Sequence, residues 1–292
     1  MTRADRGTET GAGQEAGAGR EAGPAGPGGT VRQEQPARPA PDRRLLITGG
    51  LAAACVVLFL SVFIASHLTR TSGQQETVHT GEFERIEISA GNAVTVRADP
   101  AADAVRARWE LSWSLLEPRV IEEADGDTLR LSVRCAGLPG RGCGSSVTLT
   151  VPHTAAVRVS AGGAVRVSGV AGGVEVAGGE GAVEVFDSAG PVVLHTREGA
   201  VTGTGLAGPA HVSTRNGDVS LSFAAAPSEV RVSSRDGSVD LALPEPPEGY
   251  ALDVAQRGGA ADLALASRPD SPRTVSVTTR DGTVRVRPAG DS

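Results

Sequence analysis

The sequence contains no lysine, so all 28 of its basic residues are arginine. Without lysine, it cannot form a phosphate-binding loop of the Gly-x-x-x-x-Gly-Lys type. Arginines are also outnumbered by 34 acidic residues, which gives a formal net charge of −6 at pH 7. A nucleic-acid-binding protein usually carries a basic excess, so we expect no nucleic acid partner.

Motifs for catalysis and metal binding are missing as well. The five histidines form no His-x-x-x-His motif, although we expect His195 and His211 to approach one another in neighbouring repeats. A polysaccharide lyase or hydrolase would need closely placed carboxylates. The available aspartates occupy predicted turns or outward strand positions: Asp187, Asp218, Asp236, Asp240 and Asp281. We therefore predict no catalytic residue, no metal site and no cofactor, and retain a wall-polysaccharide enzyme as the least favoured alternative.

Cysteine is rare, with three residues in the chain. Cys135 and Cys143 flank a short loop rich in glycine and proline, and we predict a disulfide between them if this region lies outside the cytoplasm. A zinc site would require two further ligands, and none lies nearby in the sequence. Cys55 lies inside an apolar run.

Residues 1–43 consist mainly of Gly, Ala, Pro, Glu, Gln and Arg, with almost no large apolar residue. Such a segment cannot bury enough apolar surface to offset the entropy lost on ordering. We therefore predict a disordered tail.

Residues 45–67 form an almost uncharged apolar segment, LLITGGLAAACVVLFLSVFIASH. About 20 helical residues suffice to cross a bilayer. Arg43 and Arg44 precede the segment and Arg70 alone follows closely, so the positive-inside rule predicts a single-pass anchor with a cytoplasmic N-terminus and an extracellular C-terminal domain. One alternative is a cleaved signal peptide, but the segment has no good cleavage site. The other is lipidation at Cys55, but a lipidated cysteine should follow its apolar core, and here most of the core follows Cys55.

The rest of the chain shows a strand-and-turn pattern. A polar linker over 68–77 is followed, over 78–290, by short Val/Leu/Ile alternations broken by Gly, Asp, Asn and Pro. One motif recurs: apolar-x-apolar, a hydroxyl residue, a polar pair, glycine, then x-Val-x-apolar. It is plainest at 211–221, 231–241 and 275–286. Composition of this kind, rich in Ala, Gly, Val and Arg, is typical of a GC-rich actinobacterial genome.

The glycines of this motif fall at nearly regular intervals. They are Gly163, Gly181, Gly199, Gly217, Gly237, Gly259 and Gly282. A period of about 20 residues predicts a β-solenoid whose repeats stack in chain order, about 4.8 Å apart. Alternate valines would point inward, and Asn-Gly or Asp-Gly pairs would form the corners. The alternative fold is an antiparallel β-hairpin meander, because the same dipeptides also favour hairpins.

Residues 78–150 are less regular, but Asn92–Val96 resembles the repeat at 160–167, so we expect the first coils to begin here. Trp109, Leu111 and Trp113 alternate and should share one face of a strand. The two tryptophans are expected to fill the core, with a sugar-stacking platform as the alternative.

These features together resemble the bacterial putative-adhesin domains of unknown function, which are related to head-GIN-type domains. The residues that carry the resemblance are the Gly-x-Val-x-Val copies, the Arg-Asp/Asn-Gly corners and the segment FERIEISAGNAVTV at 83–96. The resemblance covers about 78–288. It implies a right-handed, single-stranded, all-β solenoid on a bacterial envelope protein, and it supplies no catalytic residues.

One motif position is repeatedly arginine. Its members are Arg197, Arg215, Arg235, Arg257 and Arg280. In stacked coils they would form a ladder able to bind an anionic envelope polymer or lipid headgroups. In the alternative interpretation they are solvated corner residues offset by the acidic or polar row beside them.

The sequence therefore predicts a non-catalytic cell-envelope protein that displays a β-solenoid for adhesion, scaffolding or envelope interaction. A transmembrane sensor of envelope stress, whose N-terminal tail contacts a cytoplasmic partner, is the main alternative. The expected partner of the solenoid is an anionic envelope polymer or another envelope protein. An open solenoid end exposes strand edges, so we also expect homo-association through the ends, with the last coil near Val284 and Val286.

Overall fold

The computed structural model describes residues 52–61, 63–64, 71–114, 116–135 and 143–290. The predicted tail over 1–43 lies outside these residues. Within the predicted anchor, residues 52–61 and 63–64 are helical and exposed, and Cys55 carries a free thiol. No helix in the described part of the chain is long and apolar enough to cross a membrane, so the anchor stays a prediction.

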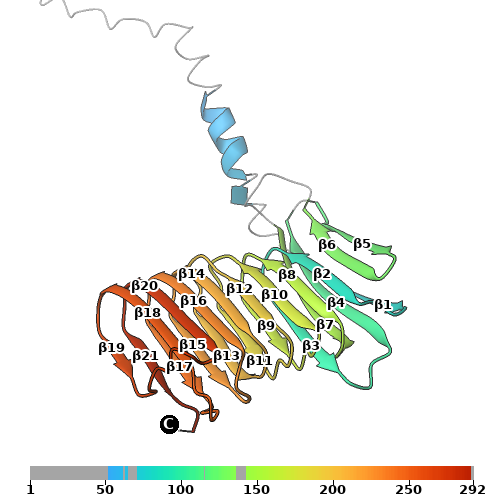
Figure 1. Cartoon of the computed structure of the whole chain (residues 1–292). Coiled ribbons are helices and arrows are strands. Elements are labelled where there is room, and N and C mark those ends of the chain that lie inside the picture. The colour runs from blue at the N-terminus through green and yellow to red at the C-terminus, as the bar shows by residue number, and fades with distance from the viewer. Residues whose placement is uncertain (1–51, 62, 65–70, 115, 136–142, 291–292) are drawn as a thin grey trace, which may run out of the picture. The chain divides into compact units, whose positions relative to one another are not determined.

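Residues 71–290 form a β domain of two long, largely parallel sheets, consistent with a β-solenoid (Figure 1). In spatial order, the first sheet contains β1 (Thr71–Thr80), β4 (Ala104–Trp113), β7 (Cys143–Pro152), β3 (Val94–Asp99), β9 (Val165–Ser168), β11 (Val183–Phe186), β13 (Val201–Leu206), β15 (Val219–Phe223), β17 (Val239–Leu243), β21 (Val284–Pro288) and β19 (Ala261–Leu263). The second contains β18 (Ala251–Gly258), β20 (Thr274–Asp281), β16 (Glu229–Asp236), β14 (Ala210–Asn216), β12 (Val192–His195), β10 (Gly173–Gly178), β8 (Ala156–Ala161), β2 (Arg85–Ala90), β6 (Thr128–Arg134) and β5 (Arg119–Asp125).

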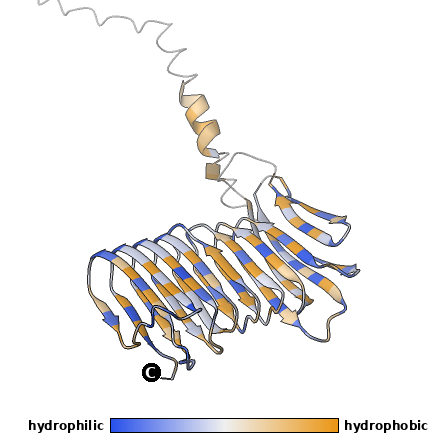
Figure 2. Ribbon diagram, viewed as in Figure 1, coloured by the Kyte–Doolittle hydropathy of each residue, from blue (hydrophilic) through white to orange (hydrophobic). Residues whose placement is uncertain are grey.

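Alternating valines build the core between the sheets. Each coil contributes one strand to each sheet, and equivalent residues stand in register, as Val183 does with Val165 and Val201. All three are at most 1% exposed, and Figure 2 shows the apolar residues continuing as bands from strand to strand. Burying a valine side chain contributes roughly 1.5–3 kcal/mol. The stacked column is therefore the main source of stability.

Strand direction distinguishes the solenoid from the hairpin meander. The antiparallel pairs are β1–β4, β4–β7 and β5–β6, all near the N-terminal end of the β domain. Every other pairing of named strands in the described residues is parallel, including the sheet pairs formed by β8 to β21. The meander is therefore wrong for the repeat region and applies only to the N-terminal cap.

The stacking order at the C-terminal end differs from the predicted chain order. The final coil, β20 and β21, lies between the coil of β16 and β17 and the coil of β18 and β19. Val284 and Val286 are fully buried, whereas Leu252 and Val254 of the outer coil are partly exposed. Insertion of the more apolar coil buries more surface, which favours this order. The coil of β18 and β19 therefore ends the β domain, in place of the coil near Val284 and Val286 that chain order predicts.

Connecting segments hold this rearranged end in place. Arg273 pairs with Glu248 at 2.6 Å and donates a hydrogen bond to the carbonyl of Ala226 at 2.8 Å. The hydrogen bond from Arg273 lowers the pKa of Glu248. The hydroxyl of Tyr250 donates to the carbonyl of Pro244 at 2.8 Å, and burial raises the Tyr250 pKa to about 12. These contacts fix the chain where it passes out to the end coil and back.

The N-terminal end shows the same exchange of order. The coil of β2 and β3 lies next to that of β8 and β9, with β6 and β7 outside it. Residues 71–77, expected as part of a linker, form most of β1, which pairs with β4 along its whole length. Glu122 on β5 accepts a hydrogen bond from Thr77 at 2.7 Å and lies 3.2 Å from His79. These contacts join the edge strands of the two sheets and close this end.

Glycine is required where the coils approach most closely. The amide of Gly163 donates to the carbonyl of Asn92 at 2.8 Å, so the repeat stacks directly on the first coil, as expected, with Asn92 in the place of the motif glycine. A Cβ on Gly179 would lie 2.8 Å from the carbonyl oxygen of Gly162. The backbone of Gly162 cannot move aside as a flexible side chain can. The close approach of these two coils therefore requires a residue without a side chain at position 179.

The predicted disulfide is present: Cys135 and Cys143 are joined, with their Cα atoms 6.1 Å apart. Cys143 begins β7, and Cys135 follows β6 directly, so the bond links the two sheets of the outer coil. Closing a loop of this length stabilises a fold by about 2.5 kcal/mol in the chain-entropy model. We expect the Cys135→Ser/Cys143→Ser variant to lose about that much in a urea unfolding experiment, and an unchanged unfolding midpoint would contradict this role.

Candidate functional site

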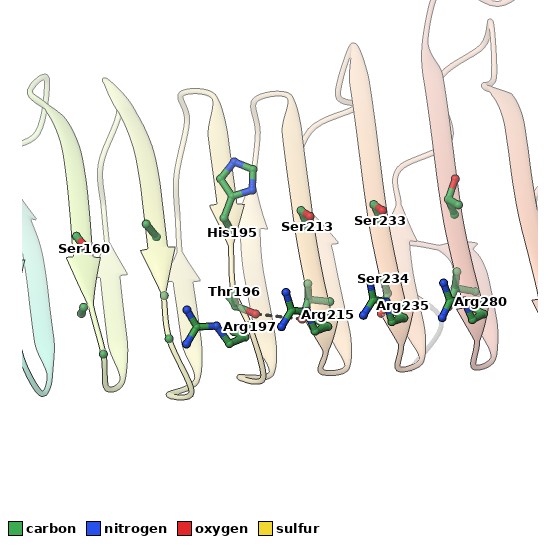
Figure 3. A pocket seen from close by; sticks show the side chains of 18 of the residues that line it. Ser160, His195, Thr196, Arg197, Ser213, Arg215, Ser233, Ser234, Arg235 and Arg280 are labelled. Atoms are coloured by element: carbon green, nitrogen blue, oxygen red, sulfur yellow. Dashed lines mark hydrogen bonds between the residues drawn. The ribbon is translucent and has the colours of Figure 1, made fainter. Parts of the chain in front are cut away.

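Five arginines occupy equivalent positions near the end of a strand in consecutive coils of the second sheet. Their position follows from the register, in which Thr214, Ser234 and Thr279 are neighbours and each stands directly before an arginine. In space the order is Arg197, Arg215, Arg235, Arg280 and Arg257, because the last two coils are exchanged. Figure 3 shows the first four side by side on successive strands. The predicted ladder therefore exists, with its last two members in reversed order.

All five arginines line one groove with a volume of about 950 Å³. We call it the arginine groove and define it by its lining: Ser160, Ala161, Gly162, Ala177, Gly178, Gly179, His195, Thr196, Arg197, Ser213, Thr214, Arg215, Ser233, Ser234, Arg235, Arg257, Thr278, Thr279 and Arg280. The lining contains no carboxylate and no phenylalanine, tyrosine or tryptophan, and its single ring is the imidazole of His195. Its chemistry is therefore that of hydrogen-bond donors and positive charge, which suits an anion rather than a neutral apolar ligand.

The arginine side chains of the groove are exposed and make no ion pair within the part of the chain that the structure describes. Arginines elsewhere on the β domain behave differently. Arg158 pairs with Glu175 at 3.0 Å, and Arg166 donates to Glu184 at 2.7 Å. Direct ion pairs therefore do not neutralise the ladder in the described residues, although Asp236 and Asp281 directly follow Arg235 and Arg280 in the sequence.

Two rows of hydroxyl residues run beside the arginines. The outer row includes Ser213, Ser233 and Thr278, which are in register. The inner row includes Thr214, Ser234 and Thr279, which are buried. The half-buried Thr196 continues this row and donates a hydrogen bond to Thr214 at 3.1 Å. The Oγ of Ser234 in this row is buried without a hydrogen-bond partner. A ligand in the groove would meet hydroxyl groups as well as guanidinium groups.

Repetition sets the electrostatics of the groove. Neighbouring strands lie about 4.8 Å apart, and two unit charges at 4 Å repel by about 1 kcal/mol in water. A row of like charges at this spacing therefore stores unfavourable energy that a bound anion relieves. An anion with charges at regular intervals relieves it at each coil.

The other predicted candidates do not join this site. His195 lines the groove, but its register partner is Ser213, whereas His211 pairs with Val193 and lies 3.2 Å from Glu229. The two histidines are thus not brought together as expected. The five predicted aspartates all lie outside the groove lining, and Asp240 pairs with Arg287 at 3.2 Å.

The predicted tryptophan face is confirmed, and it packs into the core, as expected. Trp109 is fully buried and Leu111 is 5% exposed, while Trp113 packs against the same cluster. A buried ring cannot stack on a sugar, so the sugar-platform alternative is wrong for Trp109.

The hydroxyl rows were not predicted as part of a site. The signal was present, because a serine or threonine occupies two adjacent positions before the arginine in the plainest copies of the motif.

Comparisons with known proteins give distant structural likenesses. No family model matches the chain, and no curated protein matches it. A putative adhesin from Bacteroides fragilis is 13% identical, with a TM-score of 0.47 over 74% of this chain and 97% of that one. A putative adhesin from Parabacteroides merdae is 14% identical, with a TM-score of 0.40 over 74% and 96%. A putative cell adhesion protein from Clostridium sporogenes is 8% identical, with a TM-score of 0.34 over 75% and 100%. These likenesses assign no ligand or activity to this chain.

Proposed function

We propose that the chain is a non-catalytic cell-envelope protein that displays a right-handed β-solenoid outside the membrane and binds a linear anionic envelope polymer along the arginine groove. Residues 45–67 form its single-pass anchor, and the N-terminal tail lies in the cytoplasm. Parallel strands joined by crossover connections are right-handed in nearly all known cases, which supports the handedness.

The disulfide supports the location. Bonds such as Cys135–Cys143 persist in oxidising compartments and are rare in the cytosol of most organisms. The distribution of arginines around residues 45–67 independently favours the same side of the membrane for the β domain. Two unrelated features thus agree on an extracytoplasmic β domain.

The observation that carries the proposed function is the set of five exposed arginines that line one groove without an acidic neighbour in its lining. Guanidinium groups bind phosphate and carboxylate in a forked geometry. Five consecutive coils extend the row over about 19 Å. A small anion would use one coil, whereas a linear polymer can contact several successive coils.

The test uses the full chain in nonionic detergent and measures binding to long-chain polyphosphate, polygalacturonate and neutral dextran at low and high salt. We expect binding to the polyanions that weakens as salt rises, and no binding to dextran. Pyrophosphate should bind much more weakly than polyphosphate, because linked contacts raise the effective concentration.

Vesicles separate two sources of anionic groups. Binding to phosphatidylglycerol vesicles but not to either soluble polymer would transfer the role from a polymer to lipid headgroups. Equal binding to dextran and to the polyanions, or no binding to any probe at low salt, would contradict the proposed function.

A further inference from the structure

The exchanged coil order makes β18 and β19 the end of the β domain. β18 ends one sheet with β20 as its neighbour, and β19 ends the other with β21 as its neighbour. Within the described residues, no strand covers the outer edge of either. Exposed strand edges are templates for pairing with another chain, and natural proteins usually block them.

The two ends of the β domain differ in character. At the C-terminal end, the inward side chains of Leu252 and Val254 are partly exposed, and Leu263 is 43% exposed. At the N-terminal end, β1 presents the polar sequence TSGQQETVHT, and its contacts with Glu122 close the gap between the sheets. The apolar core is thus open at one end of the β domain and closed at the other.

Backbone geometry identifies which groups of β18 lack a partner in the sheet. The amide of Leu252 donates to Ser267 Oγ at 3.0 Å, on the side away from β20, whereas the amide of Ala251 faces Arg273 beside β20. Backbone groups alternate in direction along a strand. Those of Val254 and Gln256 therefore point outward, beyond the point where Ser267 covers the edge.

We propose that a second copy of this chain pairs with β18 in an antiparallel arrangement about a twofold axis at Ala255. In this register Val254 of each copy faces Gln256 of the other, so their outward amides and carbonyls become hydrogen-bonded. The segment around Ser267 limits the pairing to residues 253–257 in each copy.

Charge supports the same register. Asp253 and Arg257 are both exposed and stand two residues on either side of Ala255. Antiparallel pairing about Ala255 places Asp253 of each copy opposite Arg257 of the other, and opposite charges directly across a strand pair are favourable. A parallel arrangement would place like charges together. The interface is isologous, because the closed polar end offers neither an apolar surface nor an outward apolar strand to the open one.

Cysteine cross-linking tests the register in the full chain, with Cys55 changed to serine to remove the exposed thiol. At the twofold axis the two Ala255 Cα atoms would lie about 4.5 Å apart, which is within disulfide range. We expect Ala255→Cys to form an inter-chain disulfide in most molecules on mild oxidation. Thr278→Cys is the matched control, because Thr278 is exposed and is the register neighbour of Ala255 one strand inward.

Two results would overturn the proposal: no dimer from Ala255→Cys, or equal dimer from both variants, which would indicate association through another segment. A charge exchange supplies a second measurement by light scattering. Asp253→Arg should weaken dimerisation at least tenfold, and Asp253→Arg/Arg257→Asp should restore it. A dimer unaffected by Asp253→Arg would also count against this register. Neither measurement depends on polymer binding.

Discussion

Replacing Gly181 with alanine is expected to lower the free energy of unfolding by about 3 kcal/mol, at the upper end of the range for overpacked sites. Gly181 stacks on Gly163, and a Cβ at Gly181 would overlap the backbone of Gly163 and Ala164. The atoms that would have to move are main-chain atoms of the neighbouring coil. Relief therefore requires the coils to separate, which weakens the parallel pairing and the valine column on both sides.

Gly173→Ala is the control for this substitution. Gly173 lies in the same region, and the nearest atom to its added Cβ would be Pro191 Cγ at 3.6 Å, an ordinary contact. Urea unfolding of both variants and the parent chain measures the difference. We expect Gly173→Ala to stay within about 1 kcal/mol of the parent. Equal stability of the two variants would contradict the close stacking of the glycine column.

The second large effect concerns the arginine groove. The variant Arg215→Ser/Arg235→Ser/Arg280→Ser is expected to bind polyphosphate on the order of 100-fold more weakly. Each exposed ion contact is worth up to about 1 kcal/mol, and about 3 kcal/mol in total corresponds to that loss. These three arginines occupy consecutive coils in the middle of the row, so their removal also interrupts it. The salt dependence of the remaining binding should be flatter.

A second triple variant controls for net charge. Arg97, Arg106 and Arg119 are exposed, lie outside the groove lining and appear in no ion pair of the described residues. Changing all three to serine removes the same charge from the chain. If binding depends only on total charge, both triple variants should lose affinity equally. Isothermal titration with polyphosphate distinguishes that result from the loss specific to the groove that we expect.

Much of the fold could be predicted because the coils repeat their chemistry. Valines recur at alternate positions, and glycines recur at a period of about 20 residues. Only parallel coils bury all of these valines and stack the glycines on one another. The register of Val165, Val183 and Val201 bears this out. The disulfide was predictable for a local reason, because Cys135 and Cys143 flank one short loop.

The order of the end coils could not be predicted from the same pattern. Equivalent coils offer nearly identical edges, so a coil can pair with either of two neighbours that the repeat does not distinguish. The choice depends on small differences in buried apolar area, such as full burial of Val284 and Val286 against partial exposure of Leu252 and Val254. Strand β1 was not predicted because its polar sequence lacks the alternation of apolar and polar residues that marks a strand. It is held by backbone pairing with the edge of β4 and not by an apolar face that packs into the core.

For the site, the sequence predicted the row but not its surroundings. Equivalent motif positions place Arg215, Arg235 and Arg280 in line whatever the exact order of the coils. Whether the adjacent Asp236 and Asp281 neutralise them depends on which way the corner directs each side chain. That direction is a property of the three-dimensional turn.

The most direct test of the proposed function is protection of individual arginines from an arginine-selective dicarbonyl reagent, with and without bound polyphosphate. Peptide mass spectrometry gives the modification rate at each site in the full chain. The arginine groove predicts a several-fold slower rate at Arg197, Arg215, Arg235 and Arg280 in the complex, with unchanged rates at Arg97, Arg106 and Arg119. Protection confined to the latter residues, or unchanged rates at the groove while polymer is bound, would contradict it.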